Sequence, residues 1–475
     1  MSKRKLAVIV LAAGQGTRMK SKMPKVLHTL AGKSMLSHVL GGVEKLSPEQ
    51  VVVVVGPDAK SVEQVAKPHM TVVQTDRLGT GHAVKQAFGA LAGFCSKGDT
   101  ADIMVIFGDT PLIKPETYAQ MVDLRRSENG PALLGLAFRP GESGRYGRVK
   151  QDDQGHVIGI IEFADASDEE KEIDLCNAGI LLGDGPTVCR LINQLDNNNA
   201  QGEYYLPVIF DFAYAEGLDT RAVEASEEEV MGINSRQELA AAELVLQKRL
   251  RVDAMAQGVT LIDPATTWLS VDTKFGCDII IEPSVFIGPN VEIADDATIK
   301  AFSHIEGAKI GTAAIIGPYA RLRPGTIIGH GGKVGNFVET KNAVLGDGAK
   351  VNHLSYIGDA EVGAKANVGA GTITCNYDGF NKWKTTIGEG AFIGSNTALV
   401  APVDIGAGAI VGAGSTVTKS VADDALAVVR GRLLDKAGAG ASFRAGRKKI
   451  KEQKLAAQNP DQNPNPSKNN EDNKG

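Results

Sequence analysis

Aliphatic residues recur at every sixth position along the chain between residues 281 and 417. The series opens with Ile281, Ile287, Ile293 and Ile299, and glycine often stands directly after the aliphatic residue. An α-helix repeats about every 3.6 residues and a strand every two, so neither element produces this period. Short strands joined by tight turns do produce it, with aliphatic side chains inside and glycine at turns of positive φ. The pattern therefore predicts a prism of stacked strands around one continuous aliphatic core.

The first half of the chain contains uninterrupted apolar runs instead of this period. Lys5–Leu11, Val51–Val55 and Ile103–Phe107 are typical of parallel strands that are buried on both faces. Ser34–Leu46 lies between the first two runs and predicts a helix. Strands and helices in this order indicate an α/β, Rossmann-like domain.

A helix is predicted at the junction of the two patterns. Ser235 and Glu238 form a capping box, so we expect a helix from there to about Ala256. From Gln458 onward the chain is rich in Asn, Pro, Lys and Asp, which predicts disorder. The chain thus divides into an α/β domain at residues 1–233, a helical linker at 234–258, a β-helix domain at 259–432, and a basic and then disordered tail at 433–475.

Length and composition agree with this division. A chain of 475 residues is too long for one core, and 55 glycines with only 5% aromatic residues suit a glycine-punctuated prism. The net charge of −5 provides no overall basic field, which argues against nucleic acid as a partner. No apolar run is long enough to predict a membrane span.

The cysteines are scattered and odd in number, and none forms a CxxC pair. Neither a disulfide framework nor a cysteine zinc site is predicted, and we expect reduced, packed thiols in the cytoplasm. The five positions are Cys95, Cys176, Cys189, Cys277 and Cys375.

A glycine-rich turn follows the first strand without a break. Ala12–Met19 and then Lys25 match neither the dinucleotide pattern nor the P-loop pattern. Backbone N–H groups in such a turn face the carboxyl edge of the sheet, where phosphates bind. Arg18 and Lys25 add full positive charge, so this edge is a candidate site for a nucleotide's phosphates.

Asp109 stands just beyond the third strand, at the usual ligand crevice of an open α/β sheet. A nucleotide triphosphate bound at this edge would need Mg²⁺ to neutralise its charge, and hard cations take carboxylate oxygens. The position of Asp109 therefore makes it a candidate metal ligand.

Polar residues interrupt the prism in neighbouring coils. His353 can accept a proton from an attacking amine near neutral pH, and Arg323 and Lys341 can hold a sugar phosphate. Ser395 is near enough in the pattern to assist an oxyanion. The hexads then stop for an excursion over residues 374–384. Loops on rigid repeats often bind ligands, so this region suits an amine acetyltransferase.

Several motifs resemble known families. The LAAGxGTRMxxxxPK string resembles the sugar nucleotidyltransferase signature, and the hexads resemble the left-handed parallel β-helix of acyltransferases, in which three hexads make one coil. LGTGHA, GDTPL, QGEYYL, NFVETK and GAGTITCNYDG extend the resemblance over roughly residues 5–432. Taken together, the chain resembles the family of bifunctional enzymes with N-acetylglucosamine-1-phosphate uridylyltransferase and glucosamine-1-phosphate N-acetyltransferase activities.

That resemblance implies UTP, acetyl-CoA and glucosamine-1-phosphate as substrates, Mg²⁺ as cofactor, a homotrimer and a cytoplasmic location. It assigns catalysis of acetyl transfer to His353, and Mg²⁺ to Asp109 and Asn234. For UTP and the UDP-sugar it implies Leu11, Ala12, Ala13, Gly14, Arg18, Lys25, Gln74, Gly79, Thr80, Phe107, Gly108, Asp109, Gly147, Glu162, Asn177 and Asn234. For glucosamine-1-phosphate it implies Arg323, Lys341, Tyr356 and Asn367, and for acetyl-CoA Ala370, Asn376, Tyr377, Ser395, Ala413 and Arg430. Phe107 departs from the family pattern, where an aromatic hydroxyl is expected.

Two other functions remain open on the sequence alone. In the first, the chain is only a nucleotidyltransferase and its β-helix serves oligomerisation. In the second, the chain is a sugar-nucleotide-binding scaffold without catalysis. Separate assays of thiol and pyrophosphate release distinguish these functions from the bifunctional one.

Overall fold

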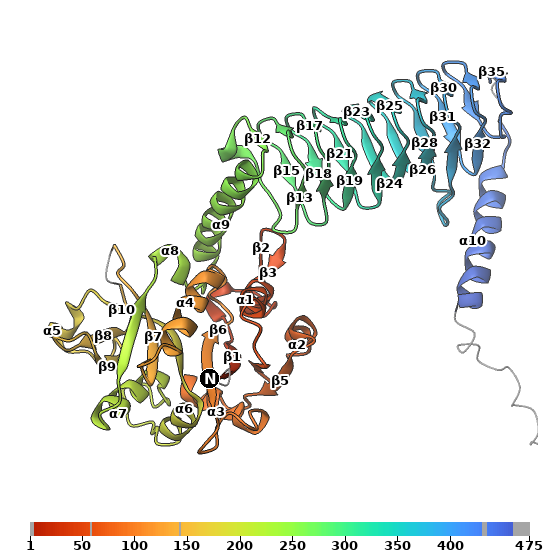
Figure 1. Ribbon diagram of the computed structural model, residues 1–475. Helices are drawn as coiled ribbons and strands as arrows, with labels where there is room; N and C mark the ends of the chain where they lie inside the picture. The colour runs from red at the N-terminus through yellow and green to blue at the C-terminus, as the bar shows by residue number, and fades with distance from the viewer. Residues whose placement is uncertain (1–3, 58, 142–143, 430–434, 459–475) are drawn as a thin grey trace, which may run out of the picture. The chain divides into compact units, whose positions relative to one another are not determined.

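The computed structural model describes residues 4–57, 59–141, 144–429 and 435–458 (Figure 1). The chain forms two compact units, Met1–Arg249 and Leu250–Gly475, and each is described by itself. In the part of the chain that the structure describes, no helix has the length and apolarity needed to cross a bilayer.

A mixed sheet organises the first unit, in the order β11-β7-β10-β6-β1-β4-β5. β10 runs antiparallel to both neighbours, and the other pairs along this order are parallel. Its strands are β1 (Lys5–Ala12), β4 (Gln50–Val55), β5 (Met70–Val73), β6 (Ala101–Phe107), β7 (Leu133–Phe138), β10 (Cys176–Asp184) and β11 (Thr220–Glu224). The three strands predicted from apolar runs are confirmed as β1, β4 and β6.

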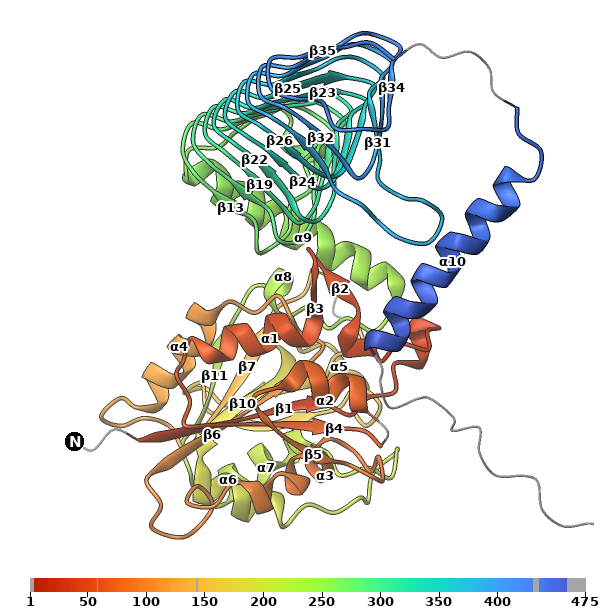
Figure 2. The same ribbon diagram turned by 90° about the vertical axis from the view of Figure 1, so that its right-hand side faces the viewer.

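Two apolar clusters cover the two faces of this sheet. Alternate residues of β1 enter different clusters, so Ile9 packs on one face and Val10 on the other. Figure 2 shows helices above and below the sheet. One face is covered by α1 (Met35–Glu44), α2 (Lys60–Ala66) and α4 (Pro115–Arg125), and the other by α3 (Thr80–Gln86), α6 (Gly185–Ile192) and α7 (Ile209–Ala215).

Shorter elements complete the first unit. β8 pairs with both β9 and the start of β10, next to α5. α9 occupies the range expected from the capping box, and Glu238 N donates to Ser235 Oγ at 3.2 Å. The elements within the first unit are β8 (Arg148–Gln151), β9 (Val157–Ile161), α5 (Asp168–Lys171), α8 (Glu227–Val230) and the hairpin β2 (Thr29–Leu30) with β3 (Lys33–Ser34). The boundary between the two units, after Arg249, falls within α9 (Arg236–Ala256).

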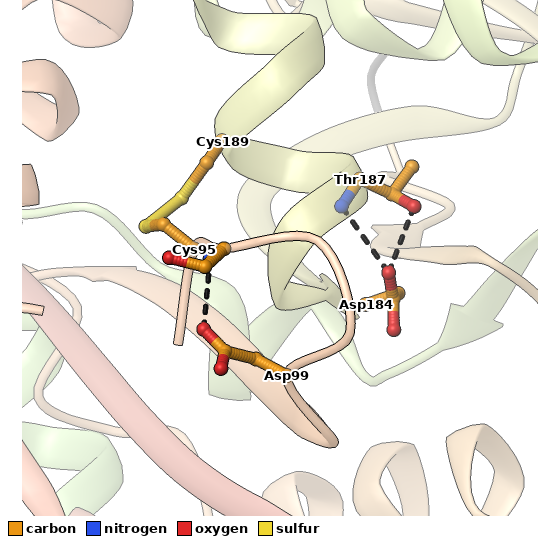
Figure 3. Close-up of a disulfide and its surroundings, with 6 residues drawn as sticks. Cys95, Asp99, Asp184, Thr187 and Cys189 are labelled. Carbon is orange, nitrogen blue, oxygen red and sulfur yellow. Dashed lines mark hydrogen bonds between the residues drawn. A yellow bond between two sulfur atoms is a disulfide. The ribbon is translucent and has the colours of Figure 1, made fainter. Parts of the chain in front are cut away.

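A disulfide joins Cys95, in the turn before β6, to Cys189 on α6 (Figure 3). The prediction of reduced thiols is therefore wrong for these two residues. No local pattern indicates this pair, because its members are 94 residues apart and meet only when α6 packs beside β6. Within the described part of the chain, Cys176, Cys277 and Cys375 are not joined in disulfides.

The second unit is the predicted prism, a parallel β-helix. Each strand pairs with one about three hexads further on, as Ile281 does with Ile299 and Ile316 with Val334. One face contains β12 (Thr260–Leu261), β14 (Ile280–Ile281), β17 (Thr298–Ile299), β20 (Ile315–Ile316), β23 (Lys333–Asn336), β25 (Lys350–His353), β27 (Asn367–Val368), β30 (Phe392–Ile393), β33 (Ile410–Val411) and β35 (Leu426–Ala427). The aliphatic positions of the hexads form a single buried core.

Two further faces close the prism. One contains β13 (Lys274–Phe275), β16 (Glu292–Ile293), β19 (Ala308–Ile310), β22 (Thr326–Ile328), β29 (Thr385–Ile387) and β32 (Val403–Ile405). The other contains β15 (Phe286–Ile287), β18 (His304–Ile305), β21 (Arg321–Leu322), β28 (Ile373–Cys375), β31 (Ala398–Val400) and β34 (Thr416–Val417). β24 (Glu339–Leu345) and β26 (Tyr356–Val362) pair on both faces.

The repeating glycines have a different role from the one predicted. Gly363 and Gly388 do not have positive φ, but a Cβ on either would lie within 2.5 Å of the next coil's backbone. Left-handed turns of the prism are made partly by other glycines, such as Gly331 and Gly390, and partly by non-glycine residues such as Ser284 and Asn290. Glycine is thus required where coils stack closely. The prediction of positive φ is wrong for glycines such as Gly363 and Gly388, and it is confirmed at Gly317, whose φ is 92°.

The basic C-terminal stretch, for which the sequence analysis predicts no secondary structure, contains the helix α10 (Ala439–Gln458). Its Arg447 lies over the Trp383 ring at 5.8 Å and forms an ion pair with Asp378 at 3.4 Å. The predicted disorder beyond residue 458 lies outside the described residues.

Candidate active sites

A cavity of about 250 Å³ opens at the carboxyl ends of β1 and β6. A cavity is therefore present where the sequence analysis predicts the nucleotide site. Its lining consists of Leu11, Ala12, Ala13, Gly14, Lys25, Val26, Gln74, Arg77, Gly79, Thr80, Ala83, Phe107, Asp109 and Glu203.

The glycine-rich turn is shaped around the Lys25 side chain. Gly16 has a φ of 61°, and a Cβ there would lie 2.5 Å from Lys25 Cβ. Arg77 fixes the other end of the turn, since its Nε donates to Ala13 O at 2.9 Å. Glycine is thus needed at position 16 both for its conformation and for the space that Lys25 occupies.

The loop before α3 and the segment that carries Glu203 both line the cavity and contact each other. Buried Gln74 donates through Nε2 to Gly79 O at 3.1 Å, and Gly79 has a φ of 103°. Gly81 N donates to Tyr204 O at 2.8 Å. These bonds hold the loop before α3 against the segment that carries Glu203.

Lys25, Asp109 and Asn234 come together from three distant parts of the chain. Lys25 Nζ donates to Asn234 Oδ1 at 2.8 Å and forms a close ion pair with Asp109. The ammonium group thus lies between two hard oxygens, which is the donor set that Mg²⁺ prefers. In the described part of the chain, no group of three acidic, His or Cys side chains is suited to a metal. Mg²⁺ usually takes its remaining ligands from water and phosphate, so these two oxygens fit it.

A smaller cavity of about 80 Å³ adjoins the first, and Thr80 and Phe107 line both. Glu162 and Asn177 face it. Burial raises the pKa of Glu162, and the nearby Asp165 and Glu203 carboxylates raise it further. The remaining lining residues are Ile160, Gly179, Ile180, Leu181, Leu206, Pro207 and Phe210.

Other predicted residues lie beside these cavities. A Cβ on Gly147 would lie 3.5 Å from Glu162 Oε2 and 3.6 Å from Asn177 Cβ. Gly108 N donates to Leu11 O at 2.9 Å and so ties β6 to β1. Arg18 is exposed and is not part of either cavity lining.

Sequence reasoning missed Arg77 and Glu203 as cavity residues. Arg77 follows the QTD string and Glu203 lies in QGEYYL, so both belong to segments that were singled out. Only the packing of those segments against one another shows that the two side chains line the cavity.

The prism places His353 at one of its corners. The turns at this corner join β23 to β24 and β25 to β26. His353 is exposed, and its Nδ1 lies 2.7 Å from Asn336 Oδ1. Because an amide oxygen only accepts, Nδ1 carries the proton and the basic lone pair is on Nε2. Glu339 and Tyr356 pair in adjacent coils of the neighbouring face.

Cationic side chains lie on that neighbouring face. Arg323 Nη1 donates to Glu339 Oε1 at 2.8 Å. A close contact with Lys382 lowers the pKa of Lys341, and Arg323 contributes to the same shift. Lys382 belongs to the excursion, so positive charge from two segments gathers at Lys341.

The residues assigned to acetyl-CoA are distributed along the later coils. Asn376 is buried and donates to Asp359, whereas Tyr377 is exposed. Asn396 N donates to Ala370 O at 2.7 Å, and Gly414 N donates to Ser395 O at 2.8 Å. Asn367 pairs with Lys350 in the ladder, and a Cβ on Gly394 would lie 2.4 Å from Ala413 N. Arg430 lies outside the described residues.

An aromatic ladder, defined here as Phe302, Tyr319 and Phe337, follows the same corner. The ring centroids of successive members are 4.8 and 5.2 Å apart. All three have positive φ and are about half exposed, as is Leu354 in the next coil. Exposed apolar rows of this kind are typical of protein–protein contacts.

Two protein families match separate parts of the chain. The MobA-like NTP transferase domain matches residues 8–148. The bacterial transferase hexapeptide family, with six repeats, matches residues 384–419. These matches agree with a nucleotidyltransferase fold followed by a left-handed β-helix.

Curated relatives match nearly the whole chain. "Bifunctional protein GlmU" of Paramagnetospirillum magneticum is 53% identical over 445 residues, covering 94% of this chain and 98% of that protein. The protein of the same name in Zymomonas mobilis is 50% identical, covering 93% and 98%. That in Azorhizobium caulinodans is 51% identical, covering 95% and 100%.

Proposed function

This chain belongs to the family of bifunctional GlmU proteins, and we propose that it carries out the two family reactions at the two sites described above. The β-helix transfers an acetyl group from acetyl-CoA to glucosamine-1-phosphate. The α/β domain then joins N-acetylglucosamine-1-phosphate to UTP and releases pyrophosphate. The product, UDP-N-acetylglucosamine, serves the synthesis of cell-wall polymers. Lys25 between Asp109 and Asn234 is the observation that best supports the uridylyl site.

In uridylyl transfer, the sugar phosphate oxygen attacks the α-phosphorus of UTP, and the bond to the β-phosphate breaks. The nucleophile belongs to the substrate, so the protein has to align the two phosphates and neutralise their charge. We assign the phosphates to Gly14, Arg18 and Lys25, and the uracil to Gln74, Gly79 and Thr80. Bound Mg²⁺, held by Asp109 and Asn234, supplies further charge neutralisation.

The smaller cavity suits the sugar. Glu162 and Asn177 face it and can bond hydroxyl and N-acetyl groups, and Gly147 leaves room beside them. Phe107 brings an apolar ring against Gly179, where a Cβ would lie 2.5 Å from the ring. A tyrosine at position 107 could donate a hydrogen bond to the ligand, whereas Phe107 offers only apolar contact.

In acetyl transfer, the amine of glucosamine-1-phosphate attacks the thioester carbonyl. His353 takes the amine proton on Nε2, while Asn336 holds Nδ1 and fixes the ring. Arg323 and Lys341 hold the sugar phosphate, with Tyr356 and Asn367 on the sugar. Collapse of the tetrahedral intermediate releases the CoA thiolate, which is then protonated.

Both activities are tested on purified protein by following free thiol and pyrophosphate separately. With glucosamine-1-phosphate, acetyl-CoA, UTP and Mg²⁺, we expect both products. If no thiol forms, and pyrophosphate forms only after N-acetylglucosamine-1-phosphate is added, the β-helix only supports oligomerisation. Neither product, with sugar nucleotide still bound, would favour the scaffold alternative.

We also propose a homotrimer whose acetyl sites lie between neighbouring prisms, and a cytoplasmic location where UTP and acetyl-CoA are made. The aromatic ladder supports the trimer, since it places exposed rings beside His353 on a single corner. Closing that corner against a second copy would remove the rings from water and surround the acetyl site.

Tyr319→Glu is expected to dissociate the trimer, because it places a charge in the middle of the ladder. The oligomeric mass is measured by light scattering, and a monomer with weakened acetyl transfer is the expected result. Phe392→Glu is the matched control, since Phe392 is equally exposed but lies on the face of β30. A Tyr319→Glu protein that remains a trimer would contradict this interface.

A further inference from the structure

Among the described residues, Arg148 has the largest fully buried side chain, with 1% of its surface exposed. It opens β8, directly after Gly147. Removing a guanidinium group from water is costly, so its hydrogen bonds are needed to hold it in place. None of the steps described above uses this side chain.

Its guanidinium donates to three separate segments. Nη1 donates to Tyr146 O at 2.5 Å and Nη2 to Gly144 O at 3.2 Å, both in the turn before β8. Nε donates to Lys171 O at 3.1 Å, at the end of α5. Nη1 also contacts Cys176 Sγ at 3.5 Å, and Cys176 opens β10.

A fourth contact is with an aromatic ring. The Arg148 Cζ atom lies 5.3 Å from the centroid of Phe163, in a cation–π arrangement. Phe163 follows Glu162 in the chain, Cys176 precedes Asn177, and Tyr146 precedes Gly147. One buried side chain thus contacts the immediate neighbour of each of three residues grouped at the smaller cavity.

Main-chain bonds extend this arrangement to the cavity residues themselves. Asn177 N donates to Gly147 O at 2.8 Å, and Asn177 Oδ1 accepts from Gly179 N at 2.9 Å. The strands that carry Gly147 and Asn177 are therefore in register where Arg148 joins them. The planar five-donor guanidinium can reach all these segments at once, which an ammonium group cannot.

We propose that Arg148 is a positioning residue that holds Gly147, Glu162 and Asn177 in the geometry that recognises the N-acetyl sugar. This rests on the proposed assignment of the smaller cavity to the sugar. Arg148 does not touch the substrate. Its effect is on binding of the sugar phosphate and on discrimination between acetylated and unacetylated sugars, and it leaves the UTP subsite unchanged.

The test is Arg148→Lys in the full-length enzyme, with KM measured separately for each substrate of uridylyl transfer. We expect KM for N-acetylglucosamine-1-phosphate to rise about tenfold, equivalent to about 1.4 kcal/mol. KM for UTP should stay within about twofold. Preference for the acetylated over the unacetylated sugar phosphate should fall, and calorimetry should show the same weakening for UDP-N-acetylglucosamine.

Two controls separate positioning from stability. The first control is Arg125→Lys, which changes another buried arginine of the same domain. Arg125 lies on α4 and pairs with Asp102, so this variant should leave both KM values unchanged. Acetyl transfer by the same protein reports the concentration of folded β-helix. A rise in both KM values together, or a lower melting temperature with unchanged KM values, would overturn the proposal.

Phe163→Leu provides a second variant if Arg148→Lys is insoluble. It removes the ring beneath the guanidinium and keeps an apolar side chain, so the sugar KM should rise about threefold. An unchanged sugar KM in this variant would overturn the proposal. If the wild-type enzyme forms no UDP-sugar, the uridylyl assignment is overturned as well. If the wild-type enzyme is active and the variants have the same sugar KM as wild type, only the role of Arg148 is overturned.

Discussion

Asp109→Asn is expected to lower uridylyl transfer by about a thousandfold, corresponding to about 4 kcal/mol of transition-state stabilisation. The substitution keeps the size of the side chain but removes the negative charge that pairs with Lys25 and that would hold Mg²⁺. Acetyl transfer should be unchanged, because the acetyl site belongs to the other compact unit. The measurement is pyrophosphate release from N-acetylglucosamine-1-phosphate and UTP.

The control for Asp109 is Asp123→Asn, which removes an exposed carboxylate of α4. It should retain wild-type activity. Metal affinity in the presence of UTP, followed with Mn²⁺ as a paramagnetic probe, should weaken only in Asp109→Asn. Full pyrophosphate release by that variant would contradict the assignment of Asp109 to the metal and the phosphates.

His353→Ala is expected to lower acetyl transfer by about 10²–10⁴-fold, because the amine loses the group that takes its proton. Free thiol formation from acetyl-CoA measures this step. Uridylyl transfer should continue when N-acetylglucosamine-1-phosphate is supplied. Removing Asn336 should have a smaller effect, since it leaves the imidazole in place but frees its Nδ1 side.

His330→Ala is the matched control for His353. His330 is also an exposed turn histidine of the prism, and its Nδ1 lies 2.8 Å from Thr312 Oγ1. It lies at a different corner, so its loss should leave thiol formation unchanged. Equal losses in both variants would indicate damage to the prism and would contradict a specific role for His353.

Local patterns predicted those features that depend on short stretches of sequence. The six-residue period predicted the prism because every inward position repeats the same environment. Apolar runs predicted β1, β4 and β6, and the capping box predicted α9. The sequence pattern shows that glycine often follows the aliphatic residue, but it does not show why. At most of these positions a Cβ would collide with the backbone of the adjacent coil, and a single hexad does not contain that neighbour.

Features created by packing could not be predicted in this way. Cys95 and Cys189 meet through the docking of α6, and Arg77 enters the nucleotide cavity by bonding the β1 turn. In the sequence, Arg148 is an ordinary polar residue at the start of a predicted strand. Only the folded structure shows that its side chain is buried between three segments. α10 has few apolar positions, and it is held to the prism partly by cation–π contacts with Trp383.

The stacking of the coils has a consequence for how the prism loses structure. Each coil bonds mainly to the coil before it and the coil after it, so the array is close to one-dimensional. In such an array, opening begins at the ends and advances one unit at a time, because an inner coil must give up two interfaces and an end coil only one. His353, Arg323 and Lys341 belong to inner coils, with several further coils on either side. Fraying at either end therefore leaves these three residues in register, whereas fraying at the C-terminal end reaches Ala413, which is assigned to acetyl-CoA, before it reaches His353.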